Sequence, residues 1–447
     1  MKPIFEPERI LIKEKTGVDL PVNCWRKVSK IYLDPTCSKP IYTFKVEDHK
    51  MTIKKDNTKL FEDYKQKSLE ELFVANAERL KQLEEESVEM LLQYIIEHSN
   101  EKFVISHSTG KDSVLAYEIW KQAFKQLEEQ YPDIHKNIDY EVAFFNTTNE
   151  SADTYKFIKK NVPKKDLKIV NPDMGFYQWL KNVKNYFIPS VFVRNCCEKF
   201  KEGQMFTEYD GDCPVSTITG LRKHESRKRK NYEFMMDKEA RIRIHGITNI
   251  PHNITTVAPA IEWTDVDVWL YIVKNNIKIN DQYYYGFNRV GCLICPYSHN
   301  YIDLLTEKYY PTHWNRWLDL LAKNYKIYGI HNRLKWTLEE WQAGRWKEGK
   351  SKEQKIITKS PTEKNVKELA EVKGISEELA KKYFKKKCDC GKSLNPTEIS
   401  MSLKFYGRNI TEGSMQCKKC FCKANGMKKD EYNERIIEFT DQGCNLF

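Results

Sequence analysis

The chain has 447 residues and a formal net charge of +11, with 74 lysines and arginines against 63 aspartates and glutamates. This length suits about two or three domains, the charge favours anionic partners, and a hydrophobic content of 40% is enough for packed cores. No apolar run reaches the roughly 18 residues of a membrane span, so we expect no membrane partner.

The N-terminal segment, "MKPIFEPERILIKEKTG", is charged throughout and lacks the apolar stretch of a secretory signal. We therefore expect a cytoplasmic protein, in which 13 cysteines indicate metal binding and not disulfides. Residues 1–85 are predicted to be an N-terminal extension. Its Cys24 and Cys37 are too few to close a metal site, and we predict that they are structural, like Cys213 further along.

A phosphate-binding loop is predicted next. The helical pattern "SVEMLLQYIIEHS" leads into the short apolar run "FVIS" and then into "SHSTGKDSVLAYEIW", residues 106–120. The apolar residues of this last stretch recur at helical spacing: Val114, Leu115, Ile119 and Trp120. A loop between a strand and a helix places backbone N–H groups and the positive end of the helix dipole where a phosphate can bind.

The loop is not a Walker A motif, because the earlier glycine is missing and Lys111 is followed by an aspartate. Gly110 would let the backbone approach a phosphate closely. The alternative interpretation is a plain helix start, with Asp112 and Ser113 in its first turn. The candidate nucleotide-binding residues are Ser108, Thr109, Gly110, Lys111, Asp112 and Ser113.

The following segments alternate between strand and helix patterns. "YEVAFFNTTN" and "LKIVNP" flank the helical "SADTYKFIKKNV", "PVSTITGLR" adds a further strand, and "WTDVDVWLYIVKNN" predicts a helix capped by Thr264. Such alternation indicates an α/β fold with a doubly wound parallel sheet, which we place in residues 86–315. Phosphate loops lie at the carboxyl ends of the strands in these sheets.

Four cysteines of this region form a candidate metal site. A vicinal pair, Cys196 and Cys197, is followed downstream by the C-x-x-C pair Cys292 and Cys295. Four thiolates suit either a 4Fe-4S cluster or a tetrahedral zinc ion, and spacing alone leaves both open.

Residues 316–360 are predicted to be a helical connector. It interleaves Trp336, Trp341 and Trp346 with basic residues, a pattern for which core packing is favoured over base stacking.

Residues 361–386 match the h-x-G-h-G-x-x-x-A pattern of a helix-hairpin-helix, except that Ser376 replaces the second glycine. Such hairpins contact DNA phosphates without reading sequence, and the alternative is a helical linker with a solvated basic face. The matching positions are Val372, Gly374, Ile375 and Ala380, and the lysines after them are Lys381, Lys382, Lys385, Lys386 and Lys387.

Residues 387–447 carry a C-x-C and a C-x-x-C motif at a separation that predicts a small zinc module. Cys422 is an alternative ligand. The predicted ligands are Cys388, Cys390, Cys417 and Cys420.

The loop resembles the S-G-G-x-D-S loop of N-type ATP pyrophosphatases. Together with the CC pair, G-L-R-x-x-E-S at 220–226, the W-T-x-x-D-V-W helix and G-C-x-x-C, it follows the order seen in the phosphoadenosine phosphosulfate reductase family. This resemblance covers residues 100–300 and implies an adenine nucleotide α hydrolase-like fold. It also implies that Cys196, Cys197, Cys292 and Cys295 hold a 4Fe-4S cluster, and that Arg222 contacts the anionic end of a nucleotide.

The chain departs from that family in two ways. It lacks the E-C-G-L-H tail of the sulfonucleotide reductases, and it keeps Lys111 and Asp112, which in the pyrophosphatases act on ATP with Mg²⁺. This mixture resembles the sulfur-transfer enzymes of DNA phosphorothioation. It implies an adenylating sulfurtransferase that acts on a nucleic acid, DNA ahead of tRNA, and that is supplied by a cysteine desulfurase or another sulfur donor. The alternatives are a thiol-dependent sulfonucleotide reductase, which would bind an adenylylated sulfur nucleotide, and a catalytically inactive DNA-binding partner.

Overall fold

The computed structural model describes the chain except residues 192–194, 227–228, 246–250, 330–335, 348–351, 358, 385–386, 408–414, 442–443, 445 and 447. Lys385 and Lys386 of the lysine run therefore lie outside the described residues. The chain divides into two units, Met1–Leu318 and Asp319–Phe447. No helix in the described part is both long and apolar enough to cross a membrane.

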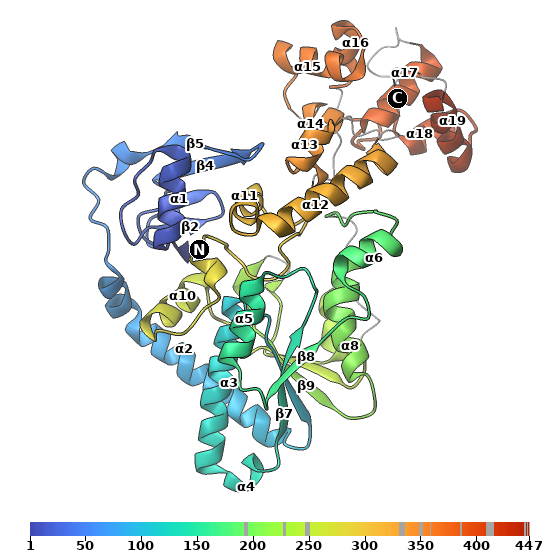
Figure 1. The fold of residues 1–447 in the computed structure, drawn as a ribbon. Coiled ribbons are helices and arrows are strands. Elements are labelled where there is room, and N and C mark those ends of the chain that lie inside the picture. Colours follow the sequence, from blue (N-terminus) through green and yellow to red (C-terminus); the bar gives the residue numbers. More distant parts are fainter. Residues whose placement is uncertain are drawn as a thin grey trace. The chain divides into compact units, whose positions relative to one another are not determined.

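The first unit is built on a six-stranded sheet in the order β10-β11-β9-β6-β7-β8 (Figure 1). Five strands pair in parallel, with β6 at the centre, where Lys102 lies opposite both Asp139 of β7 and Val215 of β9. Only β10 runs antiparallel among the described strands of this sheet. The strands are β6 (Lys102–Ser106), β7 (Asp139–Phe145), β8 (Leu167–Val170), β9 (Val215–Ile218), β10 (Met235–Met236) and β11 (Ile254–Val257).

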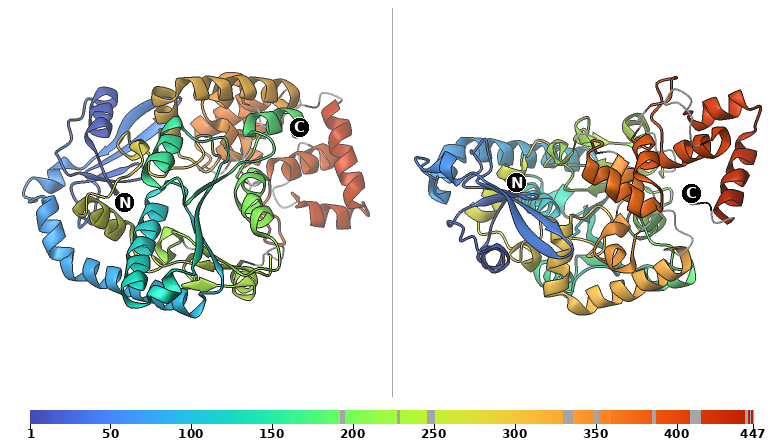
Figure 2. Two further views of the ribbon diagram at one scale, coloured as in Figure 1. Left: turned by 60° about the horizontal axis from the view of Figure 1, so that its bottom comes forward. Right: turned by 90° about the horizontal axis from the view of Figure 1, so that it is seen from above.

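Helices cover both faces of this sheet, which confirms the predicted doubly wound α/β fold. Successive strand residues point to opposite faces. Phe103 and Ile105 therefore belong to a core with residues of α2, α3 and α10, whereas Val104 packs with Tyr209 of α8. Figures 1 and 2 show α3 and α5 on one side of the sheet and α8 on the other.

The helices of this layer begin where the sequence supplies caps. Ser68 and Glu71 form a capping box on α2, and Thr264 and Asp267 form one on α10, as the sequence predicts for Thr264. The predicted helix before the loop is the second half of α2, which starts well before residue 86. The helices are α2 (Leu69–Glu97), α3 (Lys111–Gln130), α4 (Pro132–His135), α5 (Ala152–Asn161), α6 (Phe176–Asn182), α7 (Asn195–Cys197), α8 (Gly203–Tyr209), α9 (Lys238–His245) and α10 (Asp265–Lys274).

The N-terminal extension folds into a five-stranded antiparallel sheet in the order β1-β2-β3-β4-β5, with α1 (Glu6–Thr16) packed on it. Its core includes Leu11, Ile12 and Phe44 and continues into Tyr301 and Leu305 of α11 (Asn300–Tyr309), so the extension is integrated into the first unit. The strands are β1 (Lys2–Pro3), β2 (Trp25–Lys27), β3 (Lys30–Tyr32), β4 (Tyr42–Glu47) and β5 (Lys50–Asp56).

A buried ionic cluster fastens this sheet to the rest of the first unit. The Glu8 carboxylate pairs with Lys2 and accepts a hydrogen bond from Arg26 Nε at 2.5 Å, and all three side chains are buried. Arg26 also donates to the carbonyl of Gly286 at 2.5 Å. Gly286 has φ +108°, and a Cβ there would lie 2.9 Å from the Glu8 carboxyl carbon, so glycine is required. A buried charge is tolerated only when it is paired. The cluster therefore holds the N-terminal sheet in one arrangement relative to the rest of the first unit.

The second unit is helical in its described part. Its core joins α14 to α17 through residues such as Leu369, Tyr383 and Ile399. Its elements, with α12 leading into them, are α12 (Pro311–Asn324), α13 (Leu338–Gln342), α14 (Lys352–Ile357), α15 (Glu363–Lys373), α16 (Glu377–Lys382), α17 (Pro396–Tyr406), α18 (Lys418–Ala424) and α19 (Lys429–Asp441).

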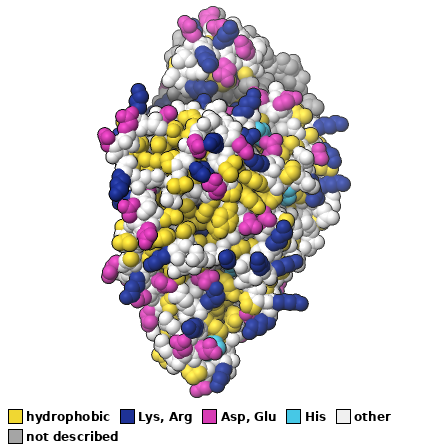
Figure 3. All heavy atoms as spheres, turned by 60° about the vertical axis from the view of Figure 1, so that its left-hand side comes forward, with side chains coloured by type: hydrophobic (Ala, Val, Ile, Leu, Met, Phe, Trp, Pro, Cys, Tyr) yellow, Lys and Arg dark blue, Asp and Glu magenta, His cyan; other side chains and the backbone are white. Residues whose placement is uncertain are grey.

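The three tryptophans of the connector are packing residues, as predicted. Trp336, Trp341 and Trp346 are all buried, and the Trp341 indole donates to Asn324 Oδ1 at 3.2 Å. They present no ring for base stacking. On the face shown in Figure 3, acidic side chains are interspersed among lysines and arginines.

Candidate active site

The predicted phosphate loop lies between β6 and α3, which begins at Lys111. Thr109, which occupies the place of the first glycine in S-G-G-x-D-S, has φ +61°. A left-handed conformation costs a non-glycine residue about 1–2 kcal/mol. The buried Thr109 is held there because its N–H donates to His107 Nδ1 at 3.2 Å and its hydroxyl accepts from Asn280 at 3.1 Å.

Four charged side chains form a closed ring at the start of α3. Lys111 Nζ lies 2.7 Å from Asp112 Oδ1 and 3.2 Å from Asp265 Oδ1. Arg222 donates to the same two oxygens, with 2.7 Å to each. Each cation therefore bridges both carboxylates. Burial would raise the pKa of Asp265, but Lys111, the Met1 amino group and Arg222 hold it well below its ordinary value.

Arg222 is fully buried, and it also donates to the Trp263 carbonyl at 3.0 Å. Its guanidinium thus positions the two carboxylates, whereas the resemblance implies contact with a nucleotide. Asp265 is the residue of this ring that sequence reasoning missed. It follows the capping threonine of α10, and the pattern there indicated only a helix start.

A glycine controls how closely the Arg222 segment approaches the loop, but it is not Gly110. A Cβ at Gly110 would make only ordinary contacts, the nearest at 3.4 Å from Ser108 Oγ. A Cβ at Gly220 would lie 2.3 Å from the carbonyl carbon of Asp112. Close backbone packing therefore requires glycine at 220, two residues before Arg222.

The ring lines a cavity of about 640 Å³, within the range of small-molecule sites. The buried Tyr283 closes one side, where its hydroxyl accepts the Lys111 N–H at 2.7 Å, and burial raises the pKa of this phenol. The N-terminal sheet contributes a further wall through Lys2 and residues 26–28. The predicted loop residues on the cavity wall are Ser108, Gly110, Lys111, Asp112 and Ser113, together with Arg222.

The predicted cysteine quartet comes together beside this cavity. Cys197 raises the pKa of Cys196 through a hydrogen bond, and burial and the nearby Cys292 and Cys295 thiols raise it further. Cys292 is partly buried, and desolvation raises its pKa, while Lys201 opposes that effect. The structure therefore brings α7 and the 292–295 loop into one neighbourhood.

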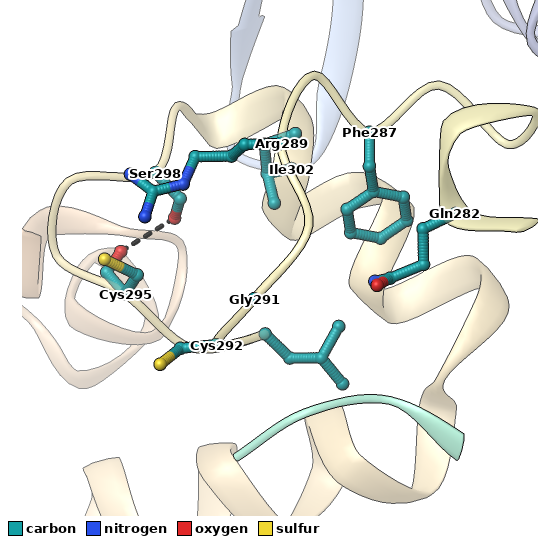
Figure 4. A pocket seen from close by; sticks show the side chains of 9 residues that line it. Gln282, Phe287, Arg289, Gly291, Cys292, Cys295, Ser298 and Ile302 are labelled. Atoms are coloured by element: carbon teal, nitrogen blue, oxygen red, sulfur yellow. Dashed lines mark hydrogen bonds between the residues drawn. The ribbon is translucent and has the colours of Figure 1, made fainter. Parts of the chain in front are cut away.

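Asn149, just after β7, holds the 292–295 loop. Its carbonyl accepts the Leu293 N–H at 2.7 Å, and its side chain donates to the Ile294 carbonyl at 2.9 Å. Figure 4 shows the Cys292 and Cys295 sulfur atoms on the side of the loop away from Phe287 and Gln282. A cavity of about 10 Å³, with Gly291 in its lining, lies beside both cysteines.

The C-terminal cysteines form a compact group of metal-ligating side chains, in which all ligand atoms lie within 4.8 Å of one another. No other group of three or more such side chains does so among the described residues. Cys390 Sγ and Cys417 Sγ are 3.7 Å apart. Two thiolates on one tetrahedral zinc stand about 3.8 Å apart, as follows from a Zn–S bond of about 2.3 Å. The geometry therefore fits a single metal ion held by Cys388, Cys390, Cys417 and Cys420.

The pKa of Cys388 supports this arrangement. Burial would raise it, but hydrogen bonds from the Cys390 and Cys417 backbone N–H groups and from neighbouring thiols lower it to about 7. A thiol that ionises near neutral pH is ready to bind a metal. Cys417 caps α18 and Cys420 follows within that helix, so local structure sets the C-x-x-C pair.

Among the described residues, no three of the upstream sulfurs all lie within 4.8 Å of one another. A cubane cluster would place each of four thiolates on a different iron.

Five cysteines lie outside the two quartets, and one of them, Cys444, packs against the core of the second unit. Cys422 packs in an apolar cluster with Phe421 and Tyr432 and is not one of the four residues of the metal-ligating group. Cys24 and Cys37 are buried in the N-terminal core, which is consistent with a structural role. Cys213 is exposed, so the prediction that its thiol is structural is wrong. Its backbone carbonyl supports the fold, because it accepts a hydrogen bond from Asn253 at 2.8 Å.

Residues 102–298 match the phosphoadenosine phosphosulfate reductase domain. An uncharacterized protein of Methanocaldococcus jannaschii is 30% identical over 288 residues, covering 63% of this chain and 61% of its own length. The adenosine 5'-phosphosulfate reductase of Staphylococcus haemolyticus is 26% identical over 163 residues, covering 35% of this chain and 60% of its own. The chain thus spans less than two thirds of either relative.

Among solved structures, the U34-tRNA thiolase NcsA from Methanococcus maripaludis, determined with its [4Fe-4S] cluster, is similar with a TM-score of 0.31 and 14% identity, covering 56% of this chain and 80% of its own. The parallel sheet, the loop at the start of α3 and the sequence match agree with one another. Residues 102–298 of this chain are a phosphoadenosine phosphosulfate reductase domain.

Proposed function

We propose that the chain is an ATP-dependent sulfurtransferase that adenylates a nucleic-acid acceptor and then replaces the adenylated oxygen with sulfur. The observation that carries the proposal is the Lys111, Asp112, Arg222 and Asp265 ring on the wall of the 640 Å³ cavity. This ring retains the two residues that distinguish an ATP-cleaving loop from one that only binds an adenylyl group.

The ring suits cleavage of ATP between the α- and β-phosphates. An acceptor oxygen would attack the α-phosphorus while the bond to the bridging oxygen breaks, and pyrophosphate would leave with the bonding electron pair. Lys111 would stabilise the growing negative charge, and the Asp112 carboxylate is placed to hold Mg²⁺ on the phosphates. Arg222 keeps both carboxylates in position because it contacts each at 2.7 Å.

The four upstream cysteines supply the second half of the proposed site. We infer that Cys196, Cys197, Cys292 and Cys295 hold a 4Fe-4S cluster, which would supply a site for binding and delivering sulfur. Asn149 orients the 292–295 loop, and Lys201 places a positive charge beside Cys292, which raises the pKa of the lysine. We further propose zinc at Cys388, Cys390, Cys417 and Cys420, where it would stabilise the second unit.

The experiment that tests the proposal is pyrophosphate release from ATP by the full chain, measured with DNA, with tRNA and without nucleic acid. We expect release that depends on one of the two nucleic acids, because the acceptor oxygen is the attacking group. A protein that ignores ATP under all three conditions would contradict the proposal.

A second candidate is a thiol-dependent sulfonucleotide reductase. The similarity to adenosine 5'-phosphosulfate reductases over the matched domain favours it. The same preparation should then release sulfite from adenosine 5'-phosphosulfate when a thiol is present. Sulfite release without any use of ATP would establish this candidate over the first.

The nucleic-acid part of the proposal rests on the α15–α16 hairpin. Gly374 turns the chain with φ +63°, as predicted, and Ser376 caps α16, accepting the Leu379 N–H at 3.2 Å. The Gly374 and Ile375 N–H groups donate to carbonyls of α15, so these two groups are not directed at a phosphate. Binding would therefore depend on the lysines, of which Lys381 is exposed.

We expect the double variant Lys381→Glu, Lys382→Glu to weaken binding of DNA or tRNA about equally across sequences, because phosphate contacts carry no base information. The slope of affinity against salt should become shallower. Lys428→Glu, Lys429→Glu, at exposed positions of the same unit, is the matched control. An equal loss in both double variants would show a general charge effect and no role for the hairpin.

A further inference from the structure

The cations around the 640 Å³ cavity fall into two groups. Most have a carboxylate partner: Lys111 and Arg222 in the ring, Lys2 and Arg26 at Glu8, and Arg229 at Glu225. Three more cations line the cavity without an ion pair to any described residue: Arg241 is partly buried, whereas Lys27 and Arg289 are exposed. The charges of these two side chains are available to a bound anion.

Lys27 comes from the N-terminal sheet, at the turn between β2 and β3. The next residue, Val28, has φ +56°, a conformation that is a genuine outlier for a β-branched side chain. Arg26 fixes this turn because its Nη1 donates to the Val28 carbonyl at 2.6 Å, and Glu8 holds Arg26 in turn. The buried cluster therefore determines where Lys27 enters the cavity wall.

Arg289 comes from the segment just before the cysteine loop. It lines both the 640 Å³ cavity and the small cavity beside Cys292 and Cys295. Figure 4 shows its guanidinium extending toward Ser298, on the side of the loop where Cys295 lies. Arg289 thus stands between the candidate nucleotide site and the candidate sulfur-delivering site.

We propose that Lys27 and Arg289 form a second anion subsite that takes the phosphate or sulfate group of the acceptor, next to the nucleotide. This inference rests on the proposed function for the identity of the acceptor. The reason is electrostatic: two uncompensated cations, contributed by different elements to one concave wall, attract a tetrahedral anion. The guanidinium adds a planar pair of donors suited to its oxygens. The N-terminal sheet is then a substrate-binding element of the enzyme.

The test measures binding to the full chain with three probes. The first is AMP, the second is adenosine 5'-phosphosulfate, and the third is the dinucleotide TpT added to AMP-saturated protein. We expect Lys27→Glu and Arg289→Glu each to weaken the binding of adenosine 5'-phosphosulfate or of TpT by about tenfold, because each variant loses one charge-assisted contact. AMP binding should stay within about twofold, because the ring and the loop hold the nucleotide.

Two controls accompany these variants. Lys30→Glu changes an exposed lysine at the other end of the same turn that does not line the cavity, and Arg289→Lys keeps the charge. We expect the first to bind all three probes normally and the second to recover most of the lost affinity.

Comparison of adenosine 5'-phosphosulfate with TpT identifies which anion occupies the subsite. A loss confined to adenosine 5'-phosphosulfate places a sulfate in the subsite, and a loss confined to TpT places a phosphodiester there. Unchanged binding of both probes, or an equal loss in Lys30→Glu, would overturn the proposal. Pyrophosphate release by the unaltered protein is measured separately, so a failure of the proposed function is distinguishable from a failure of the subsite.

Discussion

Replacing Lys111 by alanine should lower the rate of pyrophosphate release from ATP by about 10²-fold or more, the loss expected for one preorganised group that stabilises transition-state charge. Lys111 Nζ is held 2.7 Å from Asp112 and 3.2 Å from Asp265, so its position is set before the nucleotide arrives. Without it, Arg222 is the one ring cation left to the two carboxylates, with the Met1 amino group at Asp265, and the weaker compensation lets the carboxylates repel the phosphates. The measurement is single-turnover pyrophosphate release with the required nucleic acid present.

Lys121→Ala is the matched control, because Lys121 lies on the same helix, is half-exposed, and contacts Glu118 and the Tyr117 ring at a distance from the charged ring. We expect this variant to release pyrophosphate at the rate of the unaltered protein. Thermal unfolding of both variants shows whether the fold is retained. Normal turnover in a folded Lys111→Ala protein would mean that the loop does not act on the leaving pyrophosphate.

Replacing Cys197 by serine should remove the iron. Anaerobically purified protein is expected to contain about four irons per chain and to absorb broadly near about 400 nm, and the serine variant should lose both signals. The reason is that a cubane needs a thiolate on each iron, and the structure brings four cysteines together at α7 and the 292–295 loop. The measurement is metal analysis with an absorption spectrum.

Cys417→Ser provides the reciprocal comparison, because Cys417 belongs to the tight C-terminal group. We expect this variant to lose zinc and to keep its iron, and the second unit should unfold at a lower temperature. Stoichiometric zinc and no iron at the upstream cysteines would contradict the cluster assignment. Iron that disappears only in Cys417→Ser would move the cluster to the C-terminal cysteines.

The sequence by itself determined the parts of this protein that depend on near neighbours in the chain. The parallel core followed from alternating strand and helix patterns, since the side-chain periods of 2 and 3.6 are local properties. The start of α3 and the Thr264 cap followed from single residues with local hydrogen-bonding roles. The C-terminal metal group followed from two short cysteine motifs, because a turn and the first turn of a helix fix the distances between their sulfurs.

Only the tertiary structure decided which distant charges meet. Asp265 was a helix-start residue in the sequence, and it became a member of the site because β11 and α10 carry it beside Lys111 and Arg222. Arg222 was expected to contact a nucleotide, and only the structure shows that its guanidinium also bridges Asp112 and Asp265. The strands of residues 1–56 are short and weakly patterned, so the sequence did not predict that Lys27 would line the cavity. Coulomb interactions depend on the distance between charges in space, and charges far apart in sequence come close together only when the core packs.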